Sequence, residues 1–123
     1  MKVLIVDDTR DIVSLFRDYL EIRGDCKVSV AYSGEEALEA VKSDKPDLII
    51  LDVRMPGLSG LEVVQALRND GETSGIPVIL ASGVAEAPEE EERKRLGIIE
   101  FLRKPVSMKV LSGKVSELSN SMN

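Results

Sequence analysis

The 123-residue sequence contains no histidine and no tryptophan, and its single cysteine is Cys26. A single cysteine excludes an internal disulfide bond and is typical of a protein in a reducing compartment. Aromatic residues make up only 3% of the chain, so the core must be built from aliphatic side chains, as in most parallel sheets. The absence of histidine also makes an oxygen-ligated metal more plausible than zinc.

The chain also lacks a surplus of basic residues, with 16 Lys and Arg against 22 Asp and Glu and a net charge of -6. This balance argues against direct binding to nucleic acid or to an anionic membrane. No apolar run approaches the roughly 20 residues needed to span a bilayer, and the start of the sequence leads straight into a strand pattern rather than a signal peptide. The sequence therefore predicts a soluble, cytoplasmic protein, and residues 1–123 show the composition of one domain.

Apolar runs that stop on charged residues are the main feature that is present. Residues 3–6 stop at Asp7 and Asp8, residues 48–51 stop at Asp52, and residues 101–102 stop at Arg103 and Lys104. Short aliphatic runs separated by segments of helical period indicate an α/β fold with a parallel sheet. Because ligands bind beyond the carboxyl ends of such strands, we expect three carboxylates and an ammonium to meet there.

Five repeats of a strand and a helix account for the whole chain. The expected strands are residues 2–6, 27–31, 48–51, 77–80 and 98–102. The expected helices are residues 10–23, a helix opened by a capping box at Ser33, residues 61–69, a short helix near Pro88, and a helix from about Met108.

Each charged residue has an ordinary structural interpretation when it is taken alone. Asp7 and Asp8 could start a helix, Ser82 could belong to a turn, and Lys104 could be a solvated lysine. Their shared position at the carboxyl ends of strands favours a functional site. Two carboxylates about 4 Å apart repel by roughly 4 kcal/mol at the effective dielectric of a protein surface, so a cation is needed.

Carboxylate oxygens suit Mg²⁺. A carboxylate beside a divalent cation can attack a phosphoryl group and form an acyl phosphate. Positive and donor groups must then hold the transferred oxygens, and Lys104 and Ser82 are the candidates.

Four segments of the chain resemble the receiver domain of two-component response regulators. They are residues 4–8 (LIVDD), 51–60 (LDVRMPGLSG), 81–83 (ASG) and 101–105 (FLRKP). The resemblance covers essentially the whole chain, and the run from Asp52 to Gly60 is its most specific part. It implies a flavodoxin-like doubly wound (βα)5 sandwich, with a five-stranded parallel sheet in the order 2-1-3-4-5 and helices on both faces.

The same resemblance implies roles for individual residues. Asp52 would be the phosphoacceptor, Asp8 and Asp52 would bind Mg²⁺ directly, and Asp7 would help to hold it. The main-chain carbonyl of Arg54 would be a further metal ligand. Lys104 would pair with the phosphoryl group once it is transferred.

A second group of residues would form the switch. Ser82 would move toward the phosphoryl group, and Phe101 would change its rotamer in response. Pro105 would follow a cis peptide bond. Arg54 and Val84 would flank the path of the water that hydrolyses the acyl phosphate.

The function implied is a phosphorylation-dependent signalling switch of a two-component system or phosphorelay, and not an enzyme. The partner would be a histidine kinase or a histidine phosphotransfer protein, since the chain has no histidine of its own. The output would pass to an unknown downstream protein, with the chain a monomer or a weak phosphorylation-dependent dimer.

Two alternatives are weaker. A haloacid-dehalogenase-like phosphatase needs one residue between its two aspartates, whereas Asp7 and Asp8 are adjacent. A pseudo-receiver that binds a partner without phosphorylation would have no reason to keep the acidic cluster.

The segment at residues 83–96 departs from the family pattern. We expect its helix to start late, near Pro88, and to have Leu96 as its one large apolar anchor. Glutamates 89–91 each precede Arg or Lys by four residues, which favours ion pairs along the helix. We also expect the loop at residues 83–87 to be mobile until phosphorylation. The face formed by the fourth helix, fifth strand and fifth helix would then be the partner surface.

Overall fold

The computed structural model describes residues 1–22, 24, 26–83 and 88–122, with side chains described as far as residue 120. The predicted mobile loop therefore lies outside the described residues except at Gly83, and Val84 is not described. In chain order the elements are β1 Lys2–Val6, α1 Arg10–Ile22, β2 Lys27–Ala31, α2 Gly34–Ser43, β3 Leu48–Asp52, α3 Gly60–Arg68, β4 Val78–Ser82, α4 Glu90–Arg95, β5 Ile98–Arg103 and α5 Met108–Met122.

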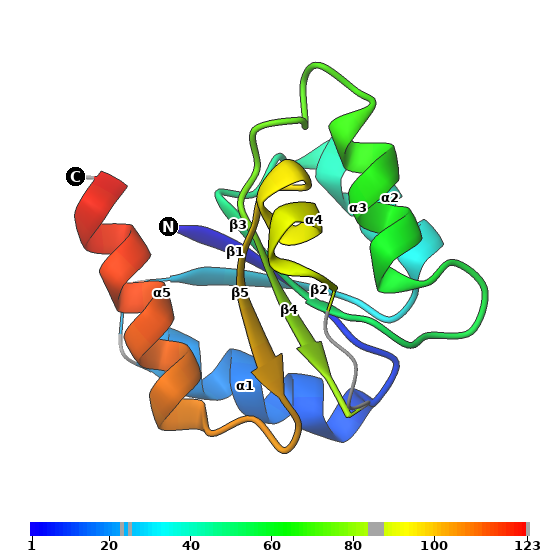
Figure 1. Cartoon of the computed structure of the whole chain (residues 1–123). Coiled ribbons are helices and arrows are strands. Elements are labelled where there is room, and N and C mark those ends of the chain that lie inside the picture. The colour runs from blue at the N-terminus through cyan, green and yellow to red at the C-terminus, as the bar shows by residue number, and fades with distance from the viewer. Residues whose placement is uncertain (23, 25, 84–87, 123) are drawn as a thin grey trace.

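The five strands form one parallel sheet in the order β2-β1-β3-β4-β5, which confirms the predicted flavodoxin-like topology. Helices α2, α3 and α4 cover one face of the sheet, and α1 and α5 cover the other (Figure 1). Among the described residues, no helix is long and apolar enough to cross a membrane.

The sheet separates two hydrophobic cores, because successive side chains of a strand point to opposite faces. On β3, Ile49 and Leu51 pack with α2 and α3, whereas Leu48 and Ile50 pack with α1 and α5. All of β3 is buried because it lies in the middle of the sheet. Each such side chain stabilises the fold by about 1.5–3 kcal/mol. The two cores fix the sheet, and the sheet fixes the edge at which the charged residues gather.

The main differences from the predicted boundaries lie at strand and helix ends. β4 ends at Ser82 rather than at Leu80, because Ala81 pairs with Asp52 and Ser82 pairs with Arg103. Helix α3 begins one residue earlier than predicted, at Gly60. Ser59 caps it in a complete capping box with Glu62.

Helix α4 starts late, as predicted, and its N-cap is Glu89. Leu96 is buried at its C-terminal end, which confirms the predicted anchor. Glu90 and Lys94 form the expected ion pair at 3.4 Å, but Arg95 pairs with Glu92 instead of Glu91. Residues three and four positions apart both lie on one face of a helix, and Arg95 pairs with the glutamate three positions before it.

Candidate functional site

Three carboxylates meet at the carboxyl edge of the sheet. Asp7 and Asp8 follow β1, and Asp52 is the last residue of the neighbouring strand β3. One oxygen from each lies within 4.8 Å of the others. Asp7 and Asp52 are buried, whereas Asp8 is exposed. The topology thus brings Asp52 beside two adjacent aspartates that lie 44 and 45 positions earlier in the sequence.

Lys104 supplies the positive charge of this cluster. Its Nζ lies 2.9 Å from Asp7 Oδ2 and 3.1 Å from Asp52 Oδ2. Burial of the ammonium works against its charge, but the hydrogen bonds to Asp7 and Asp52 and the negative charges of these residues together outweigh burial and raise the pKa of Lys104. Lys104 therefore stays protonated and bridges the two buried carboxylates.

Two backbone groups help to hold the acids. The Thr9 N–H donates to Asp7 Oδ1 at 2.9 Å. Asp52 accepts a hydrogen bond from the backbone of Arg54. Burial nevertheless raises the pKa of Asp52, against the opposing effect of Lys104, so its carboxylate is less solvated than an ordinary one.

The donor set fits Mg²⁺. Three carboxylates offer hard oxygen ligands, and the exposed Asp8 leaves coordination positions open toward solvent. The carbonyl of Arg54 belongs to the loop that follows Asp52. The family as a whole binds Mg²⁺ at such a cluster, and Asp7, Asp8 and Asp52 are the residues that would hold it here.

The loop between β3 and α3 is held close to Asp52. Gly57 has a φ of +79°, and a Cβ on Gly60 would collide with the Asp52 carbonyl oxygen. Glu35 of α2 accepts a hydrogen bond from the Leu58 N–H at 3.2 Å. The contact from Glu35 is absent from the sequence-based predictions, because nothing in a local pattern connects α2 with this loop.

The predicted switch residues lie on β4 and β5, next to this cluster. Ser82 is buried, and its carbonyl accepts the Lys104 N–H at 2.8 Å. The peptide bond between Lys104 and Pro105 is cis. Phe101 pairs with Leu80 of β4, and its partly buried side chain packs against the core beneath α2 and α3.

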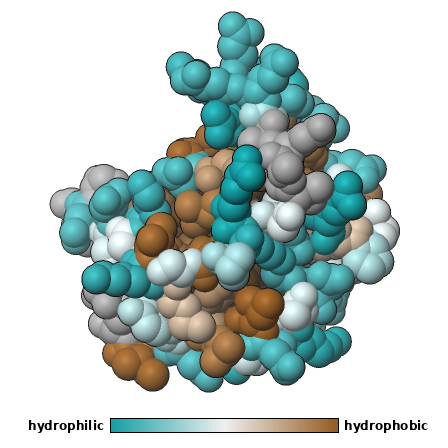
Figure 2. Space-filling view, turned by 60° about the horizontal axis from the view of Figure 1, so that its bottom comes forward, coloured by the Kyte–Doolittle hydropathy of each residue, from teal (hydrophilic) through white to brown (hydrophobic). Residues whose placement is uncertain are grey.

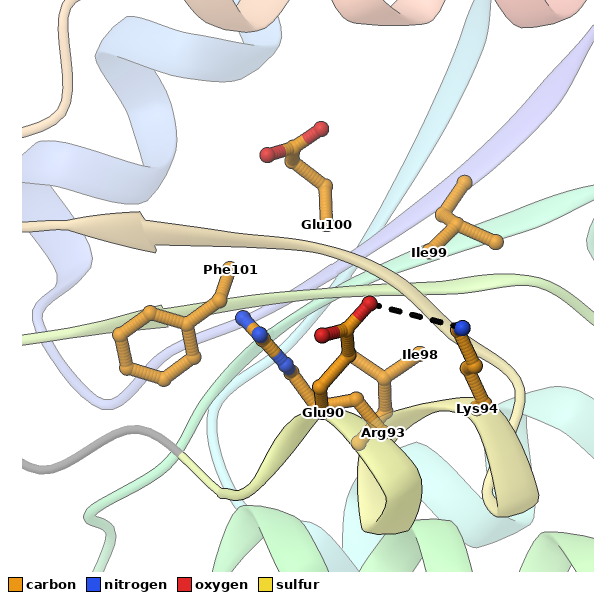
Figure 3. A pocket seen from close by; sticks show the side chains of 7 residues that line it. All are labelled: Glu90, Arg93, Lys94, Ile98, Ile99, Glu100 and Phe101. Atoms are coloured by element: carbon orange, nitrogen blue, oxygen red, sulfur yellow. Dashed lines mark ion pairs between the residues drawn. The ribbon is translucent and has the colours of Figure 1, made fainter.

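Phe101 also faces a depression of about 240 Å³ between α4 and β5. In Figure 3 the Arg93 side chain extends from α4 toward Phe101, and Glu90 lies beside it with its ion pair to Lys94. The aromatic ring is therefore placed between the core and a polar, open surface.

An apolar groove of about 410 Å³ adjoins the cluster at Lys104, and sequence reasoning missed it. Its lining comes from α1 and from the start of α5 with the segment before it: Ile12, Leu15, Phe16, Lys104, Pro105, Val106 and Met108. Leu15 is 55% exposed there. Figure 2, which brings the bottom of Figure 1 forward, shows apolar residues gathered on this face. The helical periodicity of α1 favours a core position for Leu15, so the sequence pattern does not predict that Leu15 is exposed in a groove.

The comparisons with known proteins agree with this geometry. The family model described as the response regulator receiver domain matches residues 3–116. The polar-differentiation response regulator DivK of Brucella anthropi is 37% identical over 106 residues, which cover 86% of this chain and 85% of that protein. The DivK protein of Brucella ovis is 38% identical over the same shares of the two chains.

Solved structures show the same fold over nearly the whole chain. The receiver domain of the Francisella response regulator 1452 has a TM-score of 0.86 and 30% identity, and covers 99% of this chain and 98% of its own. Vibrio cholerae chemotaxis protein CheY4 has a TM-score of 0.84 and 30% identity, with 95% and 97% covered. The chain belongs to the response regulator receiver domain family, whose members are signalling domains of two-component systems and not conventional enzymes.

Proposed function

We propose that this chain is a phosphorylation-controlled switch in which Asp52 accepts a phosphoryl group from the phosphohistidine of a histidine kinase or a histidine phosphotransfer protein. The observation that carries the proposal is the cluster itself. Asp52 ends a buried strand within reach of two further carboxylates, and Lys104 lies 3.1 Å from its oxygen. Family membership supports the histidine-kinase class of partner.

The chemistry follows from the positions of the charged groups. An oxygen of Asp52 attacks the phosphorus, and the bond between phosphorus and the histidine nitrogen breaks. Mg²⁺ bound by Asp7, Asp8 and Asp52, with the Arg54 carbonyl, would offset the negative charge of the carboxylates and the phosphoryl oxygens. Lys104 already lies beside Asp52 and gains the phosphoryl oxygens as new acceptors.

The response passes from β4 to β5. Ser82 moves toward the new phosphoryl group, and Phe101 repacks in the space that this movement opens. Ser82 and Phe101 lie on neighbouring strands, where Ser82 pairs with Arg103 and Leu80 pairs with Phe101, so the two switch residues are two register positions apart. The surface of α4, β5 and α5 changes as a result. Ile99 and Val110, which are 45% and 48% exposed in the structure, supply apolar area on this surface for a downstream protein.

The apolar groove is the proposed docking site for the helix that carries the donor histidine. Lys104 lines the groove and also contacts Asp52, so a helix lying in the groove brings its side chains to the phosphoacceptor. The exposed side chains of Ile12 and Leu15 supply apolar area for this contact.

Phosphorylation by acetyl phosphate with Mg²⁺, followed by intact-mass analysis, tests the proposal. We expect one added phosphoryl group on the wild type and none on Asp52→Asn. Asp70→Asn is the matched control, because this exposed aspartate lies in the loop after α3 and bonds to the Glu72 N–H. Equal labelling of the wild type and Asp52→Asn would show that Asp52 is not the phosphoacceptor. No labelling of the wild type would favour a binding-only pseudo-receiver.

A further inference from the structure

Arg68, the last residue of α3, has a partly buried guanidinium that the proposed phosphoryl chemistry does not use. Its Nε donates to the Leu96 carbonyl at 2.5 Å, and its Nη2 donates to the Ile76 carbonyl at 2.6 Å. Longer contacts reach the carbonyls of Thr73, Ser74 and Gly97 at 3.3, 3.1 and 3.4 Å. Arg68 thus joins three segments: the end of α3, the loop before β4, and the turn between α4 and β5.

Main-chain carbonyls take the place of a carboxylate here. Within the described residues, the groups that accept hydrogen bonds from Arg68 are all backbone carbonyl oxygens. Burial lowers the pKa of the Arg68 guanidinium. A cation that is partly withdrawn from water needs acceptors for its donors, and the rigid five-donor fork of arginine reaches several at once. A lysine ammonium has three donors and cannot span the same acceptors.

The segment that Arg68 holds is the attached end of α4. Helix α4 contains no buried residue between Glu90 and Arg95, whereas Leu96 is buried directly after it. Gly97 has a φ of +68°, and a Cβ at this position would lie 2.8 Å from Arg68 Nη2. The turn at Gly97 therefore packs closely against the Arg68 guanidinium, whereas the residues of α4 before it are not buried.

We infer that Arg68 is a positioning residue of the switch, which fixes Leu96 and Gly97 as the stationary end about which α4 moves. A pivot at this end confines the response to the first turn of α4, on the side of Glu90, Arg93 and Phe101 (Figure 3). Without the pivot, displacement at Phe101 would spread into the loop before β4 and would no longer be directed at the α4 surface. The inference rests on the proposed phosphorylation switch.

Amide chemical shifts recorded with Mg²⁺ and beryllofluoride, a mimic of the acyl phosphate, test this. In the wild type we expect shifts at Val53 and Lys104, which report binding, and at Glu90 to Glu92, with little change at Leu96 and Gly97. In Arg68→Lys we expect the shifts to extend to Leu96, Gly97 and Ile76. Gly97→Ala should give the same pattern, because its Cβ displaces the guanidinium. Arg95→Lys, an exposed change on α4 itself, should behave as the wild type.

Three results would overturn the inference. The first is seen in the wild type alone: beryllofluoride changes the amide shifts of Leu96 and Gly97 as much as those of Glu90 to Glu92. The second is a folded Arg68→Lys protein with the wild-type pattern, because a merely structural role would lower stability without redistributing the response. The third is the absence of any shift at Val53 and Lys104, which would overturn the proposed function together with this inference.

Discussion

Replacing Lys104 with methionine removes the cation that bridges two buried carboxylates while keeping a side chain of similar length. The Nζ contacts of 2.9 and 3.1 Å correspond to attractions of about 5–6 kcal/mol each at an effective dielectric of 20. The desolvation of the ions offsets much of this attraction, and removing one partner of a buried pair typically costs about 3–5 kcal/mol. Because the Lys104 side chain is 23% exposed, we expect the lower end, about 3 kcal/mol.

Urea unfolding followed by circular dichroism measures this loss, since the chain has no tryptophan to serve as a fluorescent probe. A domain of this size has about 5–15 kcal/mol of stability, so the variant should remain folded with a lower midpoint. Lys114→Met is the control. Lys114 pairs with Glu100 at 3.2 Å at the surface, where an ion pair contributes about 1 kcal/mol or less.

Mg²⁺ extends the experiment. In the wild type, the ammonium of Lys104 and a Mg²⁺ ion at the proposed site would repel each other and compete for Asp7 and Asp52. The variant should therefore gain more stability from a given Mg²⁺ concentration than the wild type does, because ligand binding stabilises by an amount that grows with affinity. Equal costs for Lys104→Met and Lys114→Met, or an equal Mg²⁺ gain in the variant and the wild type, would refute this account of the cluster.

Two further predictions concern transfer into and out of the site. Leu15→Ser should slow transfer from a phosphorylated histidine donor by about tenfold, the equivalent of 1.4 kcal/mol, because it removes apolar area from the groove. Labelling by acetyl phosphate should not change. Ile22→Ser is the control, because Ile22 is 84% exposed at the far end of α1. Slower labelling by acetyl phosphate would place the Leu15 effect in the site and not in docking. Arg54→Ala should shorten the half-life of the acyl phosphate, measured by loss of the added mass, because its long exposed side chain shields the path of the attacking water. An unchanged half-life would show that Arg54 does not control access.

The strand pattern predicted the sheet because burial on both faces leaves a local signal in the sequence. β3 is apolar from Leu48 to Leu51, and a strand in the middle of a parallel sheet has no polar face. The meeting of Asp7, Asp8 and Asp52 was predictable for the same reason, since parallel strands end at one edge. Strand ends were less predictable. Ser82 extends β4 through its pairing with Arg103, and pairing depends on a segment that is distant in the sequence.

The pairing of Lys104 shows a second limit. The resemblance assigns this lysine to the phosphoryl group, whereas the structure shows it bonded to Asp7 and Asp52 at the same time. Its position after β5 follows from the motif, but its partners follow from side-chain packing. The burial of Asp7 and Asp52 makes a cation necessary, and Lys104 is the ammonium at that edge.

Arg68 illustrates a contact for which the sequence offers almost no signal. A basic residue in the last turn of α3 already has an ordinary explanation, because it interacts favourably with the helix dipole. Its acceptors are the carbonyls of residues 73, 74, 76, 96 and 97, and every residue of any type carries a carbonyl. The one visible trace is Gly97, whose missing Cβ leaves room for the guanidinium. An interaction with the main chain is specified by where the backbone runs, so it can be found only after the fold is known.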